Sequence, residues 1–286
     1  MQTANEPPVS QKDGDNMVLT KKDYEEPRCL LNLHPETVRI PVTRVLERLD
    51  AYLQKNDTAG AERHLSYWLA EAENGNDLQG KLTILNEQIG LYRKCGKKAE
   101  GLAAIGAALA LLDELKLADS VTGATTYLNA ATGYRAFDEP EKALSLYRRA
   151  RDIYETLLSP SDARLGGLYN NMAVTLTALG GYGEARDLFS RALGIAEKRE
   201  HGETEAAVTC LNLADLTAAE KGLEAGDAEI SALLAKAEAL LDTFDLPRDG
   251  GYAYVCEKCA PVFGYYGWFV TEETLSRRAE EIYERT

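Results

Sequence analysis

The chain has 286 residues, 45% of them hydrophobic, so it is long enough to bury a sizeable core. Its formal net charge of -14 counts against binding to nucleic acids or anionic membranes, because both attract a basic protein surface. The sequence has no apolar run of about 18 residues and no basic-then-apolar leader, and its five cysteines are too scattered for a disulfide framework. These features predict a cytoplasmic protein that neither crosses nor binds a membrane.

Residues 1–35 are polar and lack a periodic pattern, which predicts a flexible N-terminal leader. From Pro41 onward apolar residues recur at helical spacing, beginning with Val42, Val45 and Leu49. This periodicity continues to the C-terminus, interrupted by short turns, and predicts a single domain over residues 36–286. We expect six helical hairpins in it, at about 38–73, 80–116, 123–158, 163–199, 204–244 and 252–286.

Small residues are regularly spaced in the third and fourth of these hairpins. In each hairpin three alanines are separated by 12 and then 7 residues, and the second set follows the first after 42 residues. The two sets are Ala131, Ala143 and Ala150, and Ala173, Ala185 and Ala192. Alanine is favoured where two helices approach closely, and aromatic rings fill the wider gaps. The spacing therefore predicts an all-α fold made of stacked hairpins.

The sequence also predicts particular helix ends in the last two hairpins. In the fifth hairpin we expect helices over 204–221 and 227–244, joined by a longer turn that contains Gly222 and Gly226. In the sixth hairpin Thr271 is the predicted N-cap of the final helix, because its hydroxyl can accept a backbone hydrogen bond and two acidic residues follow it.

The fourth hairpin carries the motif Tyr169-Asn170-Asn171-Met172-Ala173, followed by Gly183-Glu184-Ala185 and Arg191-Ala192-Leu193. With the 42-residue period, it closely resembles the tetratricopeptide repeat in the long form found in kinesin light chains. The chain is also similar to bacterial tetratricopeptide repeat proteins of about this length. The resemblance implies a right-handed α–α superhelix whose concave groove is lined by the first helix of each hairpin. It also implies that this groove holds a bound peptide.

Asparagine recurs at one position of the repeat. Asn129, Asn171 and Asn212 each stand two residues before an alanine, and Asn86 is in register within one residue. An amide offers a donor and an acceptor, which suits an extended peptide backbone, and the resemblance implies that this column faces the groove. The alternative is that these side chains bond between neighbouring repeats or to the preceding turn. The residues predicted to bind a peptide are Asn86, Asn129, Thr132, Arg135, Asn170, Asn171, Thr177, Asn212 and Asp215.

The sequence contains no Gly-x-Ser-x-Gly elbow, no phosphate-binding glycine loop and no His-Glu-x-x-His motif. Cys256 and Cys259 have the spacing of half a zinc site, but a second pair of ligands is missing. They also occupy the repeat positions of Tyr169 and Met172, which are packing positions, so we interpret them as core residues. We therefore predict no catalytic residue, no metal ion and no cofactor.

The leading hypothesis is a non-catalytic interaction module that binds an extended peptide or protein segment in the concave groove. One alternative is a peptide-responsive regulator whose superhelix tightens or opens around a small signal peptide. Another is an enzyme built on a helical solenoid. The aromatic run from Phe263 to Trp268 either caps the superhelix, which we favour, or forms an interface in a homo-oligomer.

Overall fold

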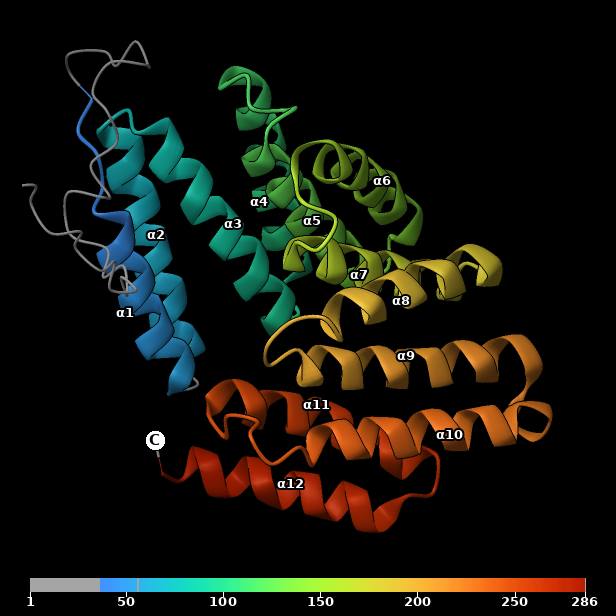
Figure 1. Ribbon diagram of the computed structural model, residues 1–286. Coiled ribbons are helices and arrows are strands. Elements are labelled where there is room, and N and C mark those ends of the chain that lie inside the picture. Colours follow the sequence, from blue (N-terminus) through green and yellow to red (C-terminus); the bar gives the residue numbers. More distant parts are fainter. Residues whose placement is uncertain (1–36, 56, 286) are drawn as a thin grey trace, which may run out of the picture. The chain divides into compact units, whose positions relative to one another are not determined.

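The computed structural model describes residues 37–55 and 57–285 (Figure 1). The leader predicted over residues 1–35 lies outside this described part. The described residues from 38 onward form one compact unit, which contains twelve α-helices and no β-strand. The prediction of an all-α fold is confirmed.

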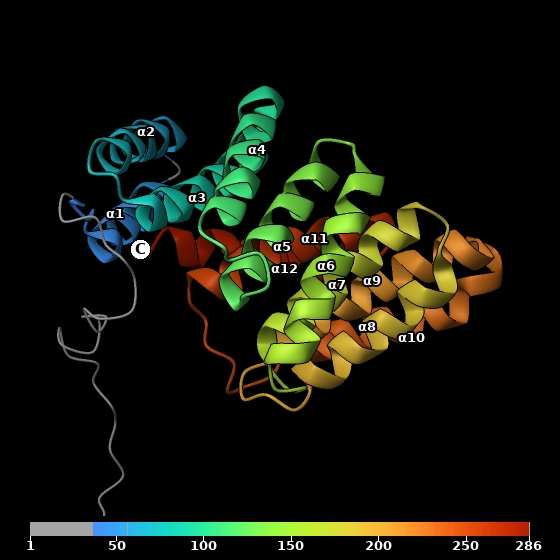
Figure 2. The same cartoon turned by 90° about the horizontal axis from the view of Figure 1, so that it is seen from above.

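Consecutive helices pair as hairpins, and Figures 1 and 2 show the pairs following one another in chain order. The first three pairs are α1 (Val42–Gln54) with α2 (Thr58–Asn74), α3 (Leu78–Cys95) with α4 (Lys98–Glu114), and α5 (Val121–Ala136) with α6 (Pro140–Leu157). The last three pairs are α7 (Ala163–Ala178) with α8 (Tyr182–Ala196), α9 (Glu203–Lys221) with α10 (Leu223–Leu241), and α11 (Gly250–Tyr265) with α12 (Phe269–Tyr283).

The odd-numbered helices form the inner layer of this stack. α3 packs on α5, α5 on α7, α7 on α9 and α9 on α11, whereas the even-numbered helices of the described chain do not form closely packed pairs with one another. Hairpins that approach more closely on one side than on the other stack into a curved solenoid. The inner face of the solenoid is therefore built from the first helix of each hairpin.

The alanine pattern explains the packing of the third and fourth hairpins. All six alanines of the pattern are at most 3% exposed, and the rings of Tyr147 and Phe189 are fully buried. The small side chains let neighbouring helices approach closely, and the rings fill the spaces that remain. Burial of a side chain as large as Phe189 stabilises the fold by about 1.5–3 kcal/mol.

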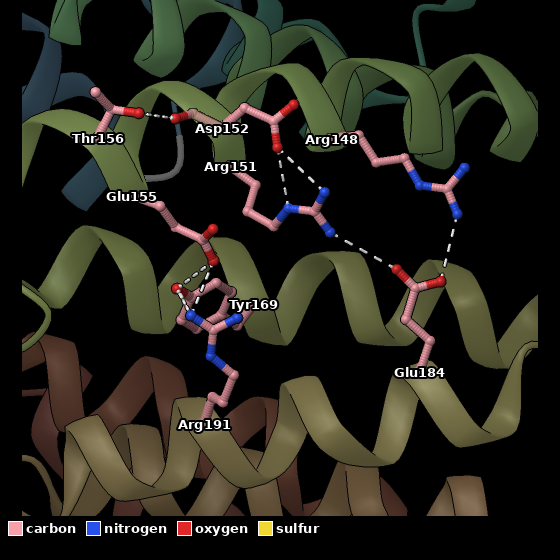
Figure 3. Close-up of polar contacts among 8 residues, drawn as sticks. All are labelled: Arg148, Arg151, Asp152, Glu155, Thr156, Tyr169, Glu184 and Arg191. Atoms are coloured by element: carbon pink, nitrogen blue, oxygen red, sulfur yellow. Dashed lines mark hydrogen bonds and ion pairs between the residues drawn. The ribbon is translucent and has the colours of Figure 1, made fainter.

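Ion pairs connect the outer helices of these two hairpins (Figure 3). Arg148 of α6 donates to Glu184 of α8, with an Nη2–Oε2 distance of 3.3 Å. Arg191 of α8 pairs with Glu155 of α6 at 2.8 Å, and its guanidinium lies 4.1 Å from the ring centroid of Tyr169. Burial, together with the hydrogen bond that its hydroxyl donates to Glu155, raises the pKa of Tyr169 to about 12. These contacts hold the third hairpin against the fourth on the outer side of the solenoid.

Two sequence predictions about helix ends are wrong. Gly222 alone forms the turn of the fifth hairpin, because its φ of 80° lets the chain reverse within one residue, and Gly226 lies inside α10. The final helix begins at Phe269, so Thr271 is not its N-cap. The Thr271 hydroxyl instead donates to Glu238 of α10, at an Oγ1–Oε1 distance of 2.6 Å, and links the last two hairpins.

The aromatic run from Phe263 to Trp268, which covers the end of α11 and the turn before α12, is part core and part surface. Phe263 is fully buried, whereas Tyr265 is 71% exposed. The hydroxyl of Tyr266 donates to Asp215 of α9 at 2.8 Å. The run therefore ties the last hairpin to the inner layer and leaves one tyrosine ring at the surface.

Candidate binding groove

A pocket of about 310 Å³ lies on the inner layer where α3, α5 and α7 meet. We call it the central pocket, and its lining residues are Asn86, Glu87, Ile89, Gly90, Arg93, Leu128, Asn129, Thr132 and Asn171. Its lining combines amides, a hydroxyl and both signs of charge with two large apolar side chains. Four residues predicted to bind a peptide are brought together here: Asn86, Asn129, Thr132 and Asn171.

Two amides of the central pocket bond to one another across a hairpin boundary. Asn129 of α5 donates from Nδ2 to Oδ1 of Asn86 on α3, at 2.8 Å. Asn86 in turn donates from its own Nδ2 to the Thr126 hydroxyl at 3.1 Å and to the Leu82 carbonyl at 2.9 Å. These amides therefore connect the second hairpin to the third.

A second amide pair repeats this arrangement between the fourth and fifth hairpins. Asn212 of α9 donates from Nδ2 to Oδ1 of Asn170 on α7, at 2.9 Å, and the Thr209 hydroxyl lies 3.4 Å from the same oxygen. The partner of Asn212 is thus Asn170 and not Asn171, although Asn171 is the residue in register with Asn129. A shift of one residue along α7 separates the bonded amide from the one that lines the central pocket.

Asn171 has a different environment from the other asparagines. It is half-buried and lines the central pocket, and its side-chain amide forms no hydrogen bond within the described part of the chain. Its donor and acceptor are therefore available to a bound molecule.

Thr132 and the other three predicted residues differ in whether their polar groups already have hydrogen-bond partners. Thr132 is buried and its hydroxyl bonds with the Tyr147 hydroxyl at 3.1 Å, while the Thr177 hydroxyl donates to a backbone carbonyl one turn earlier. Asp215 already accepts the bond from the last hairpin described above, and burial raises its pKa. Arg135 has a buried Nε that finds no hydrogen-bond partner among residues 37–55 and 57–285. Of these four, Arg135 has a donor without a partner, and that Nε atom is itself buried.

A second pocket, of about 410 Å³, is lined by residues of the first, second and last hairpins. We call it the terminal pocket, and its lining residues are Leu49, Leu53, Glu87, Gly90, Leu91, Arg93, Lys94, Tyr254 and Lys258. Because Glu87, Gly90 and Arg93 line both pockets, the terminal and central pockets adjoin along α3. Sequence reasoning missed this pocket because α1 and α11 lie at opposite ends of the chain and no repeat position marks their approach.

One carboxyl group and two cations of α3 line the terminal pocket. Burial raises the pKa of Glu87, and the negative charge of Asp50 on α1 raises it further. The neighbouring cations Arg93 and Lys94 are exposed, and neither forms an ion pair within the described residues. The boundary between the two pockets therefore presents open positive charge beside a carboxyl group that is protonated more readily than an exposed one.

A third pocket, of about 470 Å³, lies between α7, α8, α9 and α11. Small and apolar residues predominate in its lining, among them Gly166, Gly167, Val208 and Val255. Asn170 reaches this pocket while it is bonded to Asn212. The inner layer thus offers apolar as well as polar surface.

The cysteines of the Cys-x-x-Cys motif lie in the core. Cys256 and Cys259 are at most 2% exposed and pack with the apolar side chains of the last two hairpins. Burial raises the pKa of Cys256 to about 11 and that of Cys259 to about 12, so both thiols stay protonated near neutral pH. Within the described residues no group of three or more His, Cys, Asp or Glu side chains has the arrangement of a metal site.

Alanine substitutions of Asn171 and Asn212 distinguish the open amide from a bonded one. Both changes raise helix propensity by a similar amount, so the difference between their unfolding free energies reports the hydrogen bond. We expect Asn212→Ala to be less stable than Asn171→Ala by about 1 kcal/mol, because it leaves the Asn170 acceptor with only the long contact from Thr209. Urea unfolding followed by circular dichroism measures the difference, and equal stabilities would contradict a bond across this hairpin boundary.

Stacked helical hairpins with pockets along their inner layer define a helical-repeat protein of the solenoid class. Residues 124–163 and 166–199 match the family model described as tetratricopeptide repeat. The chain therefore contains tetratricopeptide repeats in its third and fourth hairpins. Such repeats generally mediate contacts between proteins and are usually non-catalytic. No described helix is both long and apolar enough to cross a membrane.

Several solved structures share the fold. BtubC (BKLC) from P. vanneervenii is 21% identical, with a TM-score of 0.61 over 72% of this chain and 83% of that chain. A putative kinesin light chain from Podosopora anserina with nearly identical TPR-like repeats is 16% identical, with a TM-score of 0.52 over 71% and 94%. The Rap protein complexed with Competence and Sporulation Factor is 14% identical, with a TM-score of 0.54 over 87% and 66%. A comparison with curated proteins gave no match.

Proposed function

We propose that this protein is a non-catalytic interaction module that binds an extended peptide or protein segment along its inner layer. The observation that carries the proposal is the central pocket, where the open amide of Asn171 lies beside polar side chains of α3 and α5. An extended segment offers alternating backbone donors and acceptors, which such an amide can match. The Rap protein, which has the same fold, was solved with a bound factor. We also propose a cytoplasmic location, supported by the free thiols in the core.

Substitution of Gly90 can test this proposal. It lies inside α3 and lines both the central and the terminal pocket, and a Cβ atom added there would meet no atom within 4 Å. Internal packing therefore does not require glycine, although glycine in a helix costs about 0.5–1 kcal/mol relative to alanine. Because Gly90 has no side chain, the part of α3 that separates the two pockets is lower at this residue. A backbone that crosses from one pocket to the other can approach α3 closely at this point.

Gly90→Ala is expected to raise the free energy of unfolding by about 0.5–1 kcal/mol and to weaken peptide binding about tenfold. The probe is a set of peptides selected on the full chain from a displayed random library, with affinity measured by fluorescence anisotropy. Gly106→Ala in α4 is the matched control, because its Cβ also meets no atom within 4 Å and it lines none of the pockets described above. The control should gain similar stability and keep its affinity. Selected peptides that bind Gly90→Ala as tightly as the parent chain would contradict the proposed groove.

A further inference from the structure

We propose that the terminal pocket anchors an acidic peptide segment through three cationic side chains, Arg93 and Lys94 of α3 and Lys258 of α11. This inference rests on the proposed function, since it names the chemical class of the segment that the inner layer binds. It also places the anchor in the pocket that residues of the first, second and last hairpins line, and not in the central pocket that the asparagine column indicates.

The lining of the terminal pocket is opposite in charge to the chain as a whole. Three cations and one carboxyl group, that of Glu87, line the pocket, whereas the chain carries a formal net charge of -14. Complementary charge steers a partner to a site and suppresses binding elsewhere. An acidic segment is therefore attracted to this pocket and repelled by the net charge of the rest of the molecule.

The cations of this pocket are open to a partner. Arg93 and Lys94 form no ion pair within the part of the chain that the structure describes, and Lys258 lies 3.8 Å from the exposed carboxylate of Glu257. By contrast, Arg148 and Arg191 on the outer helices are held in ion pairs (Figure 3). A carboxylate that binds in the terminal pocket thus has no strong internal pair to break. Exposed pairs of this kind contribute about 0.2–1 kcal/mol each, so several are needed to hold a segment.

The apolar residues of the pocket suit the same partner. Leu49 is buried and Leu53 half-buried on α1, while Tyr254 is 52% exposed on α11 with the Lys258 Nζ 5.4 Å from its ring centroid. Methylene groups of glutamate side chains can pack on these walls while their carboxylates reach the cations at the rim. Because Gly90 keeps the wall toward the central pocket low, the segment can continue there and meet Asn171.

The test measures binding of fluorescein-labelled oligoglutamate to the full chain by fluorescence anisotropy, with oligoglutamine of the same length as the neutral comparison. We expect oligoglutamine to bind at least about tenfold more weakly than oligoglutamate. Reversal of two pocket charges, in Lys94→Glu with Lys258→Glu, should also weaken oligoglutamate at least about tenfold. Arg44→Glu with Arg277→Glu is the matched control, because it makes the same change in net charge at two exposed positions that line none of the described pockets. It should change the affinity by less than about twofold at physiological salt.

Other binding results would contradict either the inference or the proposed function. An equal loss in the control, or equally tight binding of single-stranded oligodeoxythymidine, would show attraction to anions in general and overturn the inference. Absence of oligoglutamate binding would also overturn it, and the proposed function would still stand if library-selected peptides are weakened by Gly90→Ala. If those peptides are indifferent to Gly90→Ala, the proposed function itself fails. Circular dichroism and urea unfolding establish that both charge variants remain folded.

Discussion

Replacement of Phe189 by alanine is expected to lower the free energy of unfolding by about 3–5 kcal/mol. The phenyl ring of this α8 residue is fully buried in the apolar cluster that includes the third and fourth hairpins. The substitution removes the ring from an apolar environment and leaves a cavity that closely packed helices cannot fully close. Urea unfolding monitored by circular dichroism measures the loss as a lower midpoint at an unchanged slope.

A matched control exists in the same chain. Phe244 follows α10 and is 96% exposed, so Phe244→Ala should change the free energy of unfolding by less than about 0.5 kcal/mol. If Phe189→Ala does not fold, Phe189→Leu keeps most of the buried volume and should cost about 1–2 kcal/mol. A loss below about 1 kcal/mol in Phe189→Ala would mean that the ring is not enclosed as the structure shows.

Gly202→Ala is the second substitution with a large expected effect. Gly202 precedes α9, and a Cβ atom there would lie 2.0 Å from the carbonyl oxygen of Ala196 at the end of α8. The obstacle is backbone, so no side-chain rotation relieves the overlap. The turn between the fourth and fifth hairpins must shift instead, and we expect a loss of about 1–3 kcal/mol.

The contrast between two glycines isolates this steric cause. Gly106→Ala adds the same methyl group in open space and is expected to be stabilising, as stated above for the binding control. Melting temperatures measured side by side should therefore move in opposite directions for Gly202→Ala and Gly106→Ala. A Gly202→Ala protein as stable as the parent chain would show that the turn has room that the structure does not contain.

The scaffold could be predicted from sequence because its signal is local. Positions such as Ala131 and Ala173 require a small residue because helices approach closely there, within and between adjacent hairpins. The same close approach recurs with each repeat. The helix ends were harder to predict. One residue with positive φ, Gly222, forms the turn for which the sequence predicts a longer segment. The Thr271 hydroxyl donates to Glu238 of another hairpin and does not cap its own helix.

The site could be predicted only in part. The asparagine pattern located the inner layer, but each residue turns a helix by about 100°, so neighbouring side chains have different surroundings. Asn170 bonds to Asn212 while Asn171 lines the central pocket, and repeat register alone does not distinguish these two environments. The terminal pocket depends on small rotations added up over several hairpins, which bring Tyr254 near Leu49. No local sequence pattern encodes the rotation accumulated over several hairpins.

The ion pairs of the outer layer have a consequence for cooperativity. They cross hairpin boundaries: Glu62–Lys97, Glu155–Arg191, Glu229–Arg186 and Asp242–Arg278. Each contributes at most ~1 kcal/mol, but in a solenoid the boundary terms decide how many hairpins unfold together. Dissolved salt screens these exposed charges and leaves intact the apolar contacts within and between hairpins. We therefore expect concentrated salt to weaken the coupling between neighbouring hairpins and to broaden the melting transition, while the apolar clusters that cross the boundaries keep the hairpins together.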